Sequence, residues 1–557
     1  MKKTLLIHCK NIGKYINVPI GSTLLDVYNS LDFKLPYLVT SAKVNNVVRE
    51  LTYSLYKNKT IEFIDVSSDS GKRTYARTLI AVVYMAIKRL YPEMNLNLEY
   101  GIRNGFYGKL IDRYGNSFIP KSFKSLTDEI HKIIEEDIPI YQEEIETEKV
   151  IDSLEAEGLN DKAELLRSRG SIYTESYRIG THLDYSTGSL FPSTGWIYKV
   201  NIEPFFEGFI LTVPSKVNPN DVDPILEIPK MFELLKDTEE FNRVIGLPNV
   251  GALNNAIKND KTADLSRIAE ALQEKQIANI ADQICNKTPK IKVVLISGPS
   301  SSGKTTFSKR LGIQLLTNSI SPQAISLDDY FVERVNTPLD ENGEYDYESI
   351  EALDLPLFHH DLELLLAGEE VEIPTYNFET GKREYRGNKI KLNDNTILIM
   401  EGIHALNPRL TENIANERKF KIYVSVLTTI PIDCHNWIPT SDNRLIRRII
   451  RDYNTRGYSA QDTISRWTSV RRGEEKWILP FQIYADAMFN SSLIFELSVL
   501  RHHAEYILSE VPQNCDEYSE AHRLLQFIRD FKPFPEKEIP RNSLIREFVG
   551  GSGFYKY

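Results

Sequence analysis

The chain has few cysteines and no long apolar run, and both absences limit what kind of protein it is. Its 557 residues include four cysteines, which are scattered and form no CxxC pair. Scattered thiols are typical of a reducing compartment, not of a disulfide-stabilised secreted protein. No stretch approaches the roughly 20 apolar residues of a membrane-spanning helix, and the N-terminal apolar run stops at His8, too early for a signal peptide. The sequence therefore predicts a cytoplasmic protein with no membrane partner.

Positive charge is also scarce. Lysine and arginine number 67 against 77 aspartates and glutamates, which gives a net charge of -10. A surface that is basic throughout, as sequence-independent binding of nucleic acid requires, is therefore excluded, although a local basic patch is not. Internal repeats and low-complexity tracts are absent as well. At about 150 residues per domain, the length predicts three or four domains.

Local patterns divide the chain into four predicted parts. Residues 1–67 alternate strand-like runs with one short helical pattern, which predicts a small α+β module. Residues 68–225 begin with an apolar-rich helix, TYARTLIAVVYMAIKRL, and the charged stretch 125–168 within them is predicted to be largely helical. Residues 226–287 have the pattern of connecting helices. From 288 to 557 strands alternate with helices, which predicts a parallel sheet flanked by helices.

The motif GPSSSGKT carries the most specific chemistry, because it fits the phosphate-loop pattern G-x-x-x-x-G-K-[ST]. The strand-like KVVLIS precedes it and the helical TTFSKRLGIQLL follows it. Glycines let backbone N–H groups surround an anion, and the helix N-terminus adds positive potential. Lys304 would reach the β- and γ-phosphates, and the Thr305 hydroxyl would bind Mg²⁺. The predicted nucleotide-binding residues are Gly298, Pro299, Ser300, Ser301, Ser302, Gly303, Lys304, Thr305 and Thr306.

Acidic residues end two further predicted strands. QAISLDDYF reaches Asp328 and Asp329, and NTILIMEGIHAL reaches Glu401. The carboxyl ends of parallel strands border the crevice in which such sheets bind ligands. One aspartate could accept the proton of a substrate hydroxyl, and Glu401 could hold Mg²⁺ directly or through water. A helix cap or a turn would use the aspartate pair equally well.

A basic segment, DNRLIRRIIRDYNTRGYS, has its charges at helical spacing. Guanidinium groups suit a triphosphate and the charge that moves during phosphoryl transfer, although a solvated basic helix has the same pattern. Three isoleucines give this helix an apolar face, which favours docking beside the nucleotide site. The arginines are Arg444, Arg447, Arg448 and Arg451, with Arg456 just beyond.

The C-terminal half resembles the uridine kinase and phosphoribulokinase family of P-loop kinases from about residue 290 to about 490. The resemblance is carried, in family order, by GPSSSGKTT, SLDDYF, YDYESIEALD, IPTYNF, MEGIHAL and RLIRRIIRDYNTRG. It implies a P-loop NTPase fold and an ATP- and Mg²⁺-dependent kinase for a hydroxyl group, foremost that of a nucleoside. The implied roles are catalytic base for Asp328, phosphate binding for Lys304, metal binding for Thr305 and Glu401, sugar binding for Asp346, nucleoside contact for Tyr376, and a place beside the transferred phosphate for Arg448.

The base-reading positions depart from this family. Gly381 stands where uridine kinases have a histidine, Tyr458 where they have an arginine, and Arg466 where they have a glutamine. Loss of such hydrogen-bonding groups removes the specificity that they provided. The acceptor is therefore left open between a nucleoside and another hydroxyl compound, including a sugar phosphate.

The front half resembles parts of threonyl-tRNA synthetases. GSTLLDVYNSL and IEFIDVSS resemble the TGS domain, which implies a β-grasp fold, and residues 72–110 together with GTHLDYSTG resemble the editing-type domain. The two metal-binding pairs of that domain correspond to Arg77 and Ala81, and to Arg178 and His182. One histidine cannot form a closed metal site, so editing chemistry is expected to be lost. Both arginines would favour anions, and an alternative function is a nucleotide-dependent regulatory or tRNA-binding protein.

The C-terminal tail, IPRNSLIREFVGGSGFYKY, lies outside the part that resembles uridine kinases. Leu544, Ile545, Phe548 and Phe554 are apolar side chains that require burial. The tail is therefore predicted to dock on the kinase-like domain instead of extending into solvent.

Overall fold

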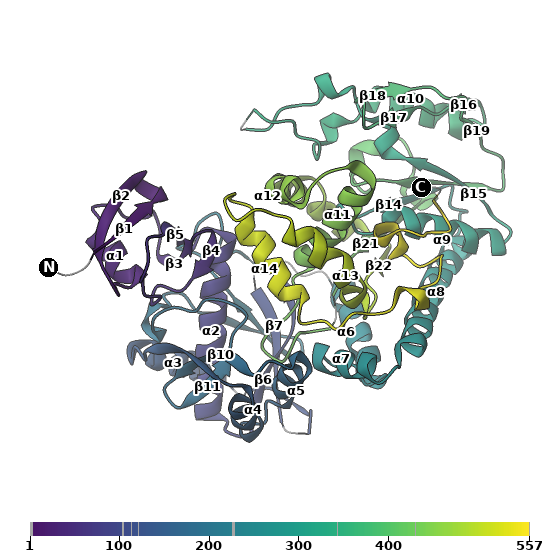
Figure 1. The fold of residues 1–557 in the computed structure, drawn as a ribbon. Helices are drawn as coiled ribbons and strands as arrows, with labels where there is room; N and C mark the ends of the chain where they lie inside the picture. Colours follow the sequence, from purple (N-terminus) through teal and green to yellow (C-terminus); the bar gives the residue numbers. More distant parts are fainter. Residues whose placement is uncertain are drawn as a thin grey trace.

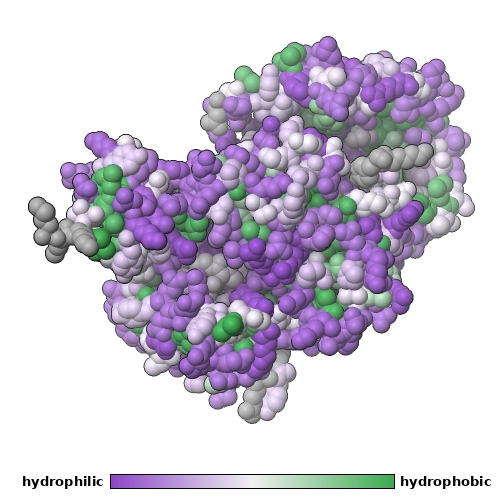
Figure 2. Space-filling model, viewed as in Figure 1, coloured by the Kyte–Doolittle hydropathy of each residue, from purple (hydrophilic) through white to green (hydrophobic). Residues whose placement is uncertain are grey.

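The computed structural model describes residues 4–102, 105–112, 114–120, 122–224, 229–341, 343–428 and 430–555. The chain passes from a small N-terminal sheet, through a mixed region, to a parallel sheet surrounded by helices (Figure 1). The face shown in Figure 2 is mostly hydrophilic, with small separate hydrophobic patches. Within the described ranges, no helix combines the length and the apolarity needed to cross a membrane.

The N-terminal module is a mixed five-stranded sheet with one helix, in agreement with the predicted α+β module. β1 pairs in parallel with β5, and the other neighbours are antiparallel. Alternation along β1 buries Leu5, Ile7 and Cys9 in the core of this module. Its strand order is β2-β1-β5-β3-β4. The elements are β1 (Thr4–Cys9), β2 (Lys14–Pro19), α1 (Leu24–Ser30), β3 (Val39–Val44), β4 (Val47–Arg49) and β5 (Thr60–Asp65).

The second region surrounds the long helix α2 (Asp69–Leu90), which begins where the Ser68 hydroxyl accepts the N–H of Gly71 at 3.0 Å. It holds two antiparallel sheets, β11-β10-β9 and β12-β13-β7-β6, with β8 paired to β7. The helices are α3 (Phe123–Glu135), α4 (Thr147–Ala156) and α5 (Asn160–Arg169). The strands are β6 (Asn95–Ile102), β7 (Gly105–Ile111), β8 (Ser117–Phe118), β9 (Ile140–Glu146), β10 (Tyr173–Ile179), β11 (His182–Tyr185), β12 (Asn201–Phe205) and β13 (Gly208–Thr212).

The prediction that residues 125–168 are largely helical is confirmed, since α3, α4 and α5 cover most of them. The strand β9, between α3 and α4, is the part that the sequence did not predict. Pro139 disfavours a helix at the start of this strand, and every residue of β9 pairs antiparallel with β10. The charged residues of β9 thus lie along a strand, because pairing with β10 determines the conformation of this segment.

Three helices connect this region to the C-terminal sheet: α6 (Pro229–Val244), α7 (Val250–Lys258) and α8 (Thr262–Asn286). The sheet itself is fully parallel, in the order β15-β20-β14-β21-β22. Its strands are β14 (Val293–Ser297), β15 (Ser321–Ser326), β20 (Thr396–Glu401), β21 (Lys419–Ser425) and β22 (Ala487–Asn490). The helices of this region are α9 (Lys304–Thr317), α10 (Leu355–Leu366), α11 (Thr440–Arg456), α12 (Ala460–Trp477), α13 (Glu496–Ser509), α14 (Tyr518–Ile528) and α15 (Arg546–Val549). Two short hairpin-like sheets pair β16 (Glu370–Glu372) with β19 (Lys389–Lys391), and β17 (Thr375–Asn377) with β18 (Lys382–Glu384).

Both faces of the parallel sheet are buried, as continuous apolar runs in parallel strands require. Val294 and Ile296 of β14 join a core that also contains apolar residues of α2, α8, α11 and α13. Val293 and Leu295 face the opposite way, into a second core with residues of α10. The first core is continuous from the front half of the chain to the C-terminal sheet, so the two halves are packed against each other.

The predicted docking of the tail is confirmed for its first part. Leu544, Ile545 and Phe548 are buried in the first core, while Phe554 is only half-buried. The ring of Phe548 lies 4.8 Å from the guanidinium of Arg447 on α11.

A fully buried ion pair joins α11 to α13. Arg447 binds both carboxylate oxygens of Glu496 and donates further hydrogen bonds to the Ser491 carbonyl at 3.0 Å and the Ser301 carbonyl at 3.3 Å. The guanidinium thus also contacts the loop that follows β14.

Substituting one partner of this pair tests how much it stabilises the fold. Arg447→Leu leaves Glu496 buried without a counter-charge, which is expected to cost about 3–5 kcal/mol of stability. The double variant Arg447→Leu/Glu496→Leu should recover most of that loss, because no buried charge is left over. Thermal unfolding followed by circular dichroism measures both. A single variant as stable as the parent would contradict this expectation.

Candidate active site

The loop between β14 and α9 is held in a conformation that only glycine permits at two positions. A Cβ atom on Gly298 would lie 2.1 Å from the carbonyl oxygen of Val424 in β21. Gly303 has a φ of 81°, and a Cβ there would lie 2.5 Å from a methyl carbon of Leu544. The loop therefore passes close to both the neighbouring strand and the C-terminal tail.

The charged and hydroxyl groups of this loop meet at the end of the sheet. Lys304 Nζ donates to the carbonyl oxygens of Gly298 at 3.0 Å and Pro299 at 3.3 Å. The hydroxyls of Ser301 and Ser302 are buried and have no hydrogen-bond partner in the part of the chain that the structure describes. Unpartnered buried hydroxyls in a loop rich in N–H groups fit a bound anion.

Thr305 and Glu401 form a pair of oxygen ligands. The Thr305 hydroxyl donates to Glu401 Oε1 at 3.0 Å. Burial raises the pKa of Glu401 to about 7, although the Lys304 ammonium lowers it. A buried carboxylate beside a hydroxyl is an oxygen donor set of the kind that Mg²⁺ takes, and a divalent cation would offset the cost of burying the charge. These residues therefore fit the metal that the sequence predicts.

Asp328 and Asp329 lie in the turn directly after β15. Strand register places Ser326 opposite Glu401, and Glu401 opposite Ile296, so the loop and both acidic segments start at the same edge of the sheet. Burial raises the pKa of Asp328, against the opposing charges of Lys304, Arg456 and Arg451. Asp329 faces away from this group, since its Oδ1 accepts the N–H of Tyr376 at 3.2 Å.

Tyr376 and Asp346, the two residues expected to bind the acceptor, lie on different segments of the C-terminal half. Tyr376 is buried in β17, with its ring 5.6 Å from that of Phe331 and 5.1 Å from that of Phe378. Asp346 is half-buried, and its Oδ1 accepts the N–H of Glu348 at 3.2 Å. The predicted substrate residues thus lie on two separate segments, one of them joined to the strand-end turn through Asp329.

Arg334 takes the space beside Gly381, the position where uridine kinases have a histidine. A Cβ on Gly381 would lie 2.8 Å from Cβ of Arg334, and the φ of 69° is itself unfavourable for other residues. Arg466 lies 4.7 Å from the ring of Tyr458, so the other two altered positions contact each other. The altered base-reading positions therefore place Arg334 against Gly381 and Arg466 beside the ring of Tyr458.

The arginines of α11 divide into two groups, and the prediction that they all serve a triphosphate is wrong for two of them. Arg444 and Arg447 are buried in ion pairs with Glu474 and Glu496. Arg448 does reach the loop, because its Nη1 donates to the Ser300 hydroxyl at 3.0 Å. Helical periodicity directs the first two arginines inward, so their charges stabilise the packing of α11.

Two carboxylates near the loop escaped the sequence analysis. Glu348 lies within YDYESIEALD. Burial raises the pKa of its carboxyl group to about 7, although the positive charge of Arg448 opposes this rise. Its Oε2 atom is buried and has no hydrogen-bond partner among the described residues. Glu547, in the tail, accepts the N–H of Thr306 at 3.2 Å and its hydroxyl at 2.6 Å. The position of Glu348 two residues after Asp346 was a usable signal, but nothing in the sequence of the tail pointed to the loop.

A glycine-containing loop at the start of a helix, with carboxylates at the ends of neighbouring parallel strands, defines the class of P-loop phosphotransferases. Residues 293–494 match the family model described as "Phosphoribulokinase / Uridine kinase family", close to the span expected from the motifs. A uridine kinase of Lactobacillus helveticus is 29% identical over 205 residues, which are 36% of this chain and 86% of that enzyme. The match supports an ATP-dependent kinase of a small molecule.

The remaining comparisons concern the front half and the fold. A threonine–tRNA ligase of Clostridium kluyveri is 31% identical over 191 residues, which are 34% of this chain; the chain spans only 29% of that relative's length. A solved structure described as a possible uridine kinase from Bacillus stearothermophilus covers 39% of this chain and 98% of its own, at 22% identity and a TM-score of 0.27. The chain thus joins a region similar to threonine–tRNA ligases to a region matching the kinase family.

The residues expected to replace the editing metal ligands do not come together as predicted. Arg178 is ion-paired with Glu143 at 3.0 Å on the neighbouring strand, and it does not reach Arg77. Arg77 contacts the loop after β11 instead: its Nη1 donates to the Ser189 carbonyl at 3.4 Å, and Gly188 leaves room for its guanidinium. Arg77 and Arg178 were both expected to make one pocket favourable for anions. That expectation is wrong for Arg178, which lies outside the pocket that Arg77 and His182 line.

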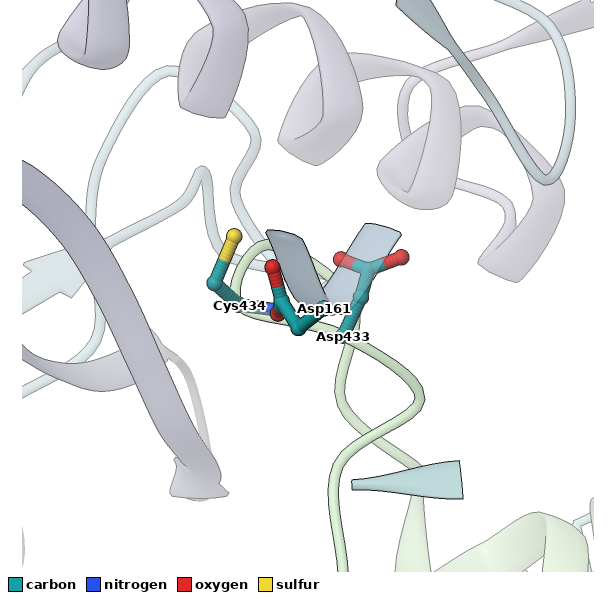
Figure 3. A group of neighbouring side chains, drawn as sticks. All are labelled: Asp161, Asp433 and Cys434. Carbon is teal, nitrogen blue, oxygen red and sulfur yellow. The ribbon is translucent and has the colours of Figure 1, made fainter. Parts of the chain in front are cut away.

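Asp161, Asp433 and Cys434 form the one group of possible metal ligands found among the described residues (Figure 3). Asp433 accepts hydrogen bonds from the Tyr185 hydroxyl, from His435 N at 2.8 Å and from Asn436 Nδ2 at 2.8 Å. Asp161 accepts the N–H of Cys434. With so many donors on these carboxylates, the group serves to fasten the front half to the segment before α11.

The raised pKa of Glu401 predicts how metal-dependent nucleotide binding changes with pH. Only the ionised carboxylate holds Mg²⁺, and a group with a pKa of about 7 gains a proton as the pH falls through 7. The Mg²⁺-dependent affinity for ATP should therefore weaken by about tenfold from pH 8 to pH 6. Titration calorimetry at the two pH values measures it. Glu401→Gln should bind Mg²⁺-ATP weakly at both pH values. If the affinity of this variant changed with pH as steeply as that of the parent, Glu401 would not be the group that holds the metal.

Proposed function

We propose that this protein is an ATP- and Mg²⁺-dependent kinase that phosphorylates a hydroxyl group of a small molecule, foremost a nucleoside. The observation that carries the proposal is the meeting of three groups at one sheet edge: the phosphate loop, the Thr305–Glu401 pair and Asp328. Each has a separate task in phosphoryl transfer, and the family match of residues 293–494 supports the same reaction.

In this mechanism the loop N–H groups and Lys304 hold the β- and γ-phosphates. Lys304 would exchange its contacts with the carbonyls of Gly298 and Pro299 for phosphate oxygens. Arg448, 3.0 Å from the Ser300 hydroxyl, lies where it can offset charge on the transferred group. Mg²⁺, when held by Thr305 and Glu401, would neutralise charge on the phosphate oxygens.

Asp328 accepts the proton of the acceptor hydroxyl as that oxygen attacks the terminal phosphorus. Burial raises its pKa, which makes it a stronger base than an exposed aspartate, and the charges of Lys304, Arg456 and Arg451 oppose that rise. Asp346 and Tyr376 would position the acceptor. Holding both reactants in line lowers the entropic part of the barrier.

A sugar phosphate is the second candidate acceptor. Arg334 beside Gly381 and Arg466 over Tyr458 place positive charge where a neutral base is read in uridine kinases. Guanidinium groups bind phosphate oxygens in a fork geometry, which a phosphorylated pentose could use. Arg383 is not available for this purpose, because it is ion-paired with Asp354 at 2.9 Å.

A panel of acceptors tests the proposal directly. Protein, ATP and Mg²⁺ are incubated with uridine, cytidine, adenosine, guanosine and ribose 5-phosphate, and products are identified by mass spectrometry. Asp328→Asn should lower turnover by about 10²–10⁴-fold with ATP affinity unchanged, because only the base is removed. Asp329→Asn, which can keep the bond to Tyr376, is the matched control and should retain most activity.

The outcomes separate the candidate functions. Product from ribose 5-phosphate alone would favour the second candidate. Absence of any product from the panel, together with tRNA that copurifies with the protein, would contradict the kinase and favour a nucleotide-dependent RNA-binding protein.

A further inference from the structure

A cavity of about 820 Å³ lies between the front half of the chain and the kinase-like helices. On one side its walls are β4, α2, α5 and the loop after β11; on the other they are α13, α14 and the segment before α11. Figure 1 shows α14 beside β4 and the upper end of α2, and the two elements β4 and α14 are in contact. A volume of this size is typical of small-molecule sites.

The cavity is cationic although the protein is acidic. Ten lysines and arginines line it, against five aspartates and glutamates, whereas the whole chain has a net charge of -10. A concentration of one sign of charge in a hollow with low-dielectric walls attracts ions of the opposite sign. The basic residues are Arg49, Lys72, Arg73, Arg77, Lys162, Arg169, Arg501, Arg523, Arg529 and Lys532.

Arg77 is one of several cavity cations that form no ion pair among the described residues. Its one hydrogen bond there is the 3.4 Å contact of its Nη1 with the Ser189 carbonyl. Burial, together with the nearby guanidinium groups of Arg73 and Arg523, lowers the pKa of Arg77 to about 9. A buried charge kept in this way is costly, and an anion would remove the cost.

The two neighbouring arginines are held in position for the same ligand. Arg523 binds both oxygens of Asp442, at 2.7 and 3.0 Å, and its Nε lies 2.9 Å from Glu520. Arg73 reaches the same Glu520 oxygen at 3.3 Å. Arg523 also donates to the second oxygen of Glu520, so one of its five N–H groups is left, whereas Arg73 uses a single N–H in the contact with Glu520. Both guanidinium groups can therefore still donate to a further anion while these contacts persist.

We infer that this cavity binds a small phosphorylated molecule, with a phosphate group on Arg73, Arg77 and Arg523. Three guanidinium groups suit the several oxygens and the double charge of phosphate better than those of a single carboxylate. The inference does not depend on the proposed kinase reaction, because none of these residues belongs to the phosphate loop.

Calorimetric titration with inorganic pyrophosphate tests this site. The full chain should bind two equivalents, one in the cavity and one at the phosphate loop. Arg77→Gln, which keeps a polar side chain but removes the charge, should lower the affinity of the cavity site by about tenfold or more, whereas Lys304→Ala should weaken the site at the phosphate loop. Arg178→Ala is the matched control, since this arginine lies outside the cavity, and it should retain both sites.

Two outcomes would overturn the inference. One is a single pyrophosphate site that depends on Lys304 and not on Arg77. The other is tRNA binding that depends on Arg77 with no pyrophosphate site in the cavity. Arg77→Lys gives an independent check, because it keeps the positive charge but loses the two-pronged hydrogen bonding of a guanidinium group. This variant should bind pyrophosphate in the cavity more weakly than the parent but more tightly than Arg77→Gln.

A separate observation concerns the tail, which occupies donors of the phosphate loop. Thr306 is the third residue of α9, so its N–H has no partner within the helix and points toward the anion site. Glu547 Oε2 accepts both this N–H and the Thr306 hydroxyl, at 3.2 and 2.6 Å. The Tyr555 hydroxyl lies 3.1 Å from the same Thr306 oxygen, and Leu544 packs on Gly303.

We propose that the Glu547 carboxylate competes with a nucleotide phosphate for the start of α9, so that the tail restrains nucleotide binding. This proposal rests on the proposed function, because it assigns a regulator to the same loop. A carboxylate is an anion that a helix N-terminus binds, and it carries less charge than a triphosphate, so the nucleotide would displace it at the expense of affinity.

ATP binding to the full chain tests the tail. Glu547→Ala should bind Mg²⁺-ATP about three- to tenfold more tightly than the parent, because one charged hydrogen bond no longer has to be broken. Tyr555→Phe should give a smaller gain, and Glu538→Ala, directly before the tail and away from the loop, should give none. Circular dichroism verifies that the variants are folded.

The results distinguish the two proposals from each other. Equal ATP affinity in the parent, Glu547→Ala and Tyr555→Phe would overturn the tail proposal alone. Absence of ATP binding in every protein would overturn both the tail proposal and the kinase function.

Discussion

The free N–H groups at the start of α9 are the constraint around which the C-terminal half is built. A helix leaves its first N–H groups without partners, and here those groups face the edge where β14, β15 and β20 end. Glycine at 298 and 303 lets the loop turn tightly enough to present them. The positive end of a helix favours negative charge, and three carboxylates, those of Glu401, Asp328 and Glu547, lie near the start of α9. Burial raises the pKa of Glu401 and Asp328, and the ammonium of Lys304 opposes that rise.

Helix α11 links this edge to the front half of the chain. Its Arg447 and Arg448 contact the loop, at the Ser301 carbonyl and the Ser300 hydroxyl, while its Asp442 is held by Arg523 of α14. The same Arg523 lines the cationic cavity, and Glu520 connects it to Arg73 of α2. A ligand in the cavity would thus lie one ion pair away from the helix that contacts the nucleotide loop. That continuity gives the front half a physical route to the kinase site.

Much of this arrangement could be predicted from the sequence, because it depends on local patterns. The strand–loop–helix around GPSSSGKT, the acidic residues at strand ends and the alternation of strands and helices all follow from short-range periodicity. Long-range pairing was the part that could not be predicted. The burial of Arg444 and Arg447, the strand β9 inside a charged stretch and the approach of Glu547 to Thr306 depend on partners 27 to 241 residues away. The error over Arg178 has a related cause, since only the fold shows which loop faces Arg77.

The shared apolar core makes the front and back halves of the chain depend on each other for stability. Apolar residues of α2, α8 and α13 share one interior, and Tyr185 of the front half binds Asp433 of the back half inside it. If the two halves were produced separately, each would expose to water the apolar residues that it now buries in the shared core. Each half is therefore expected to be stable only while the other covers this shared interior.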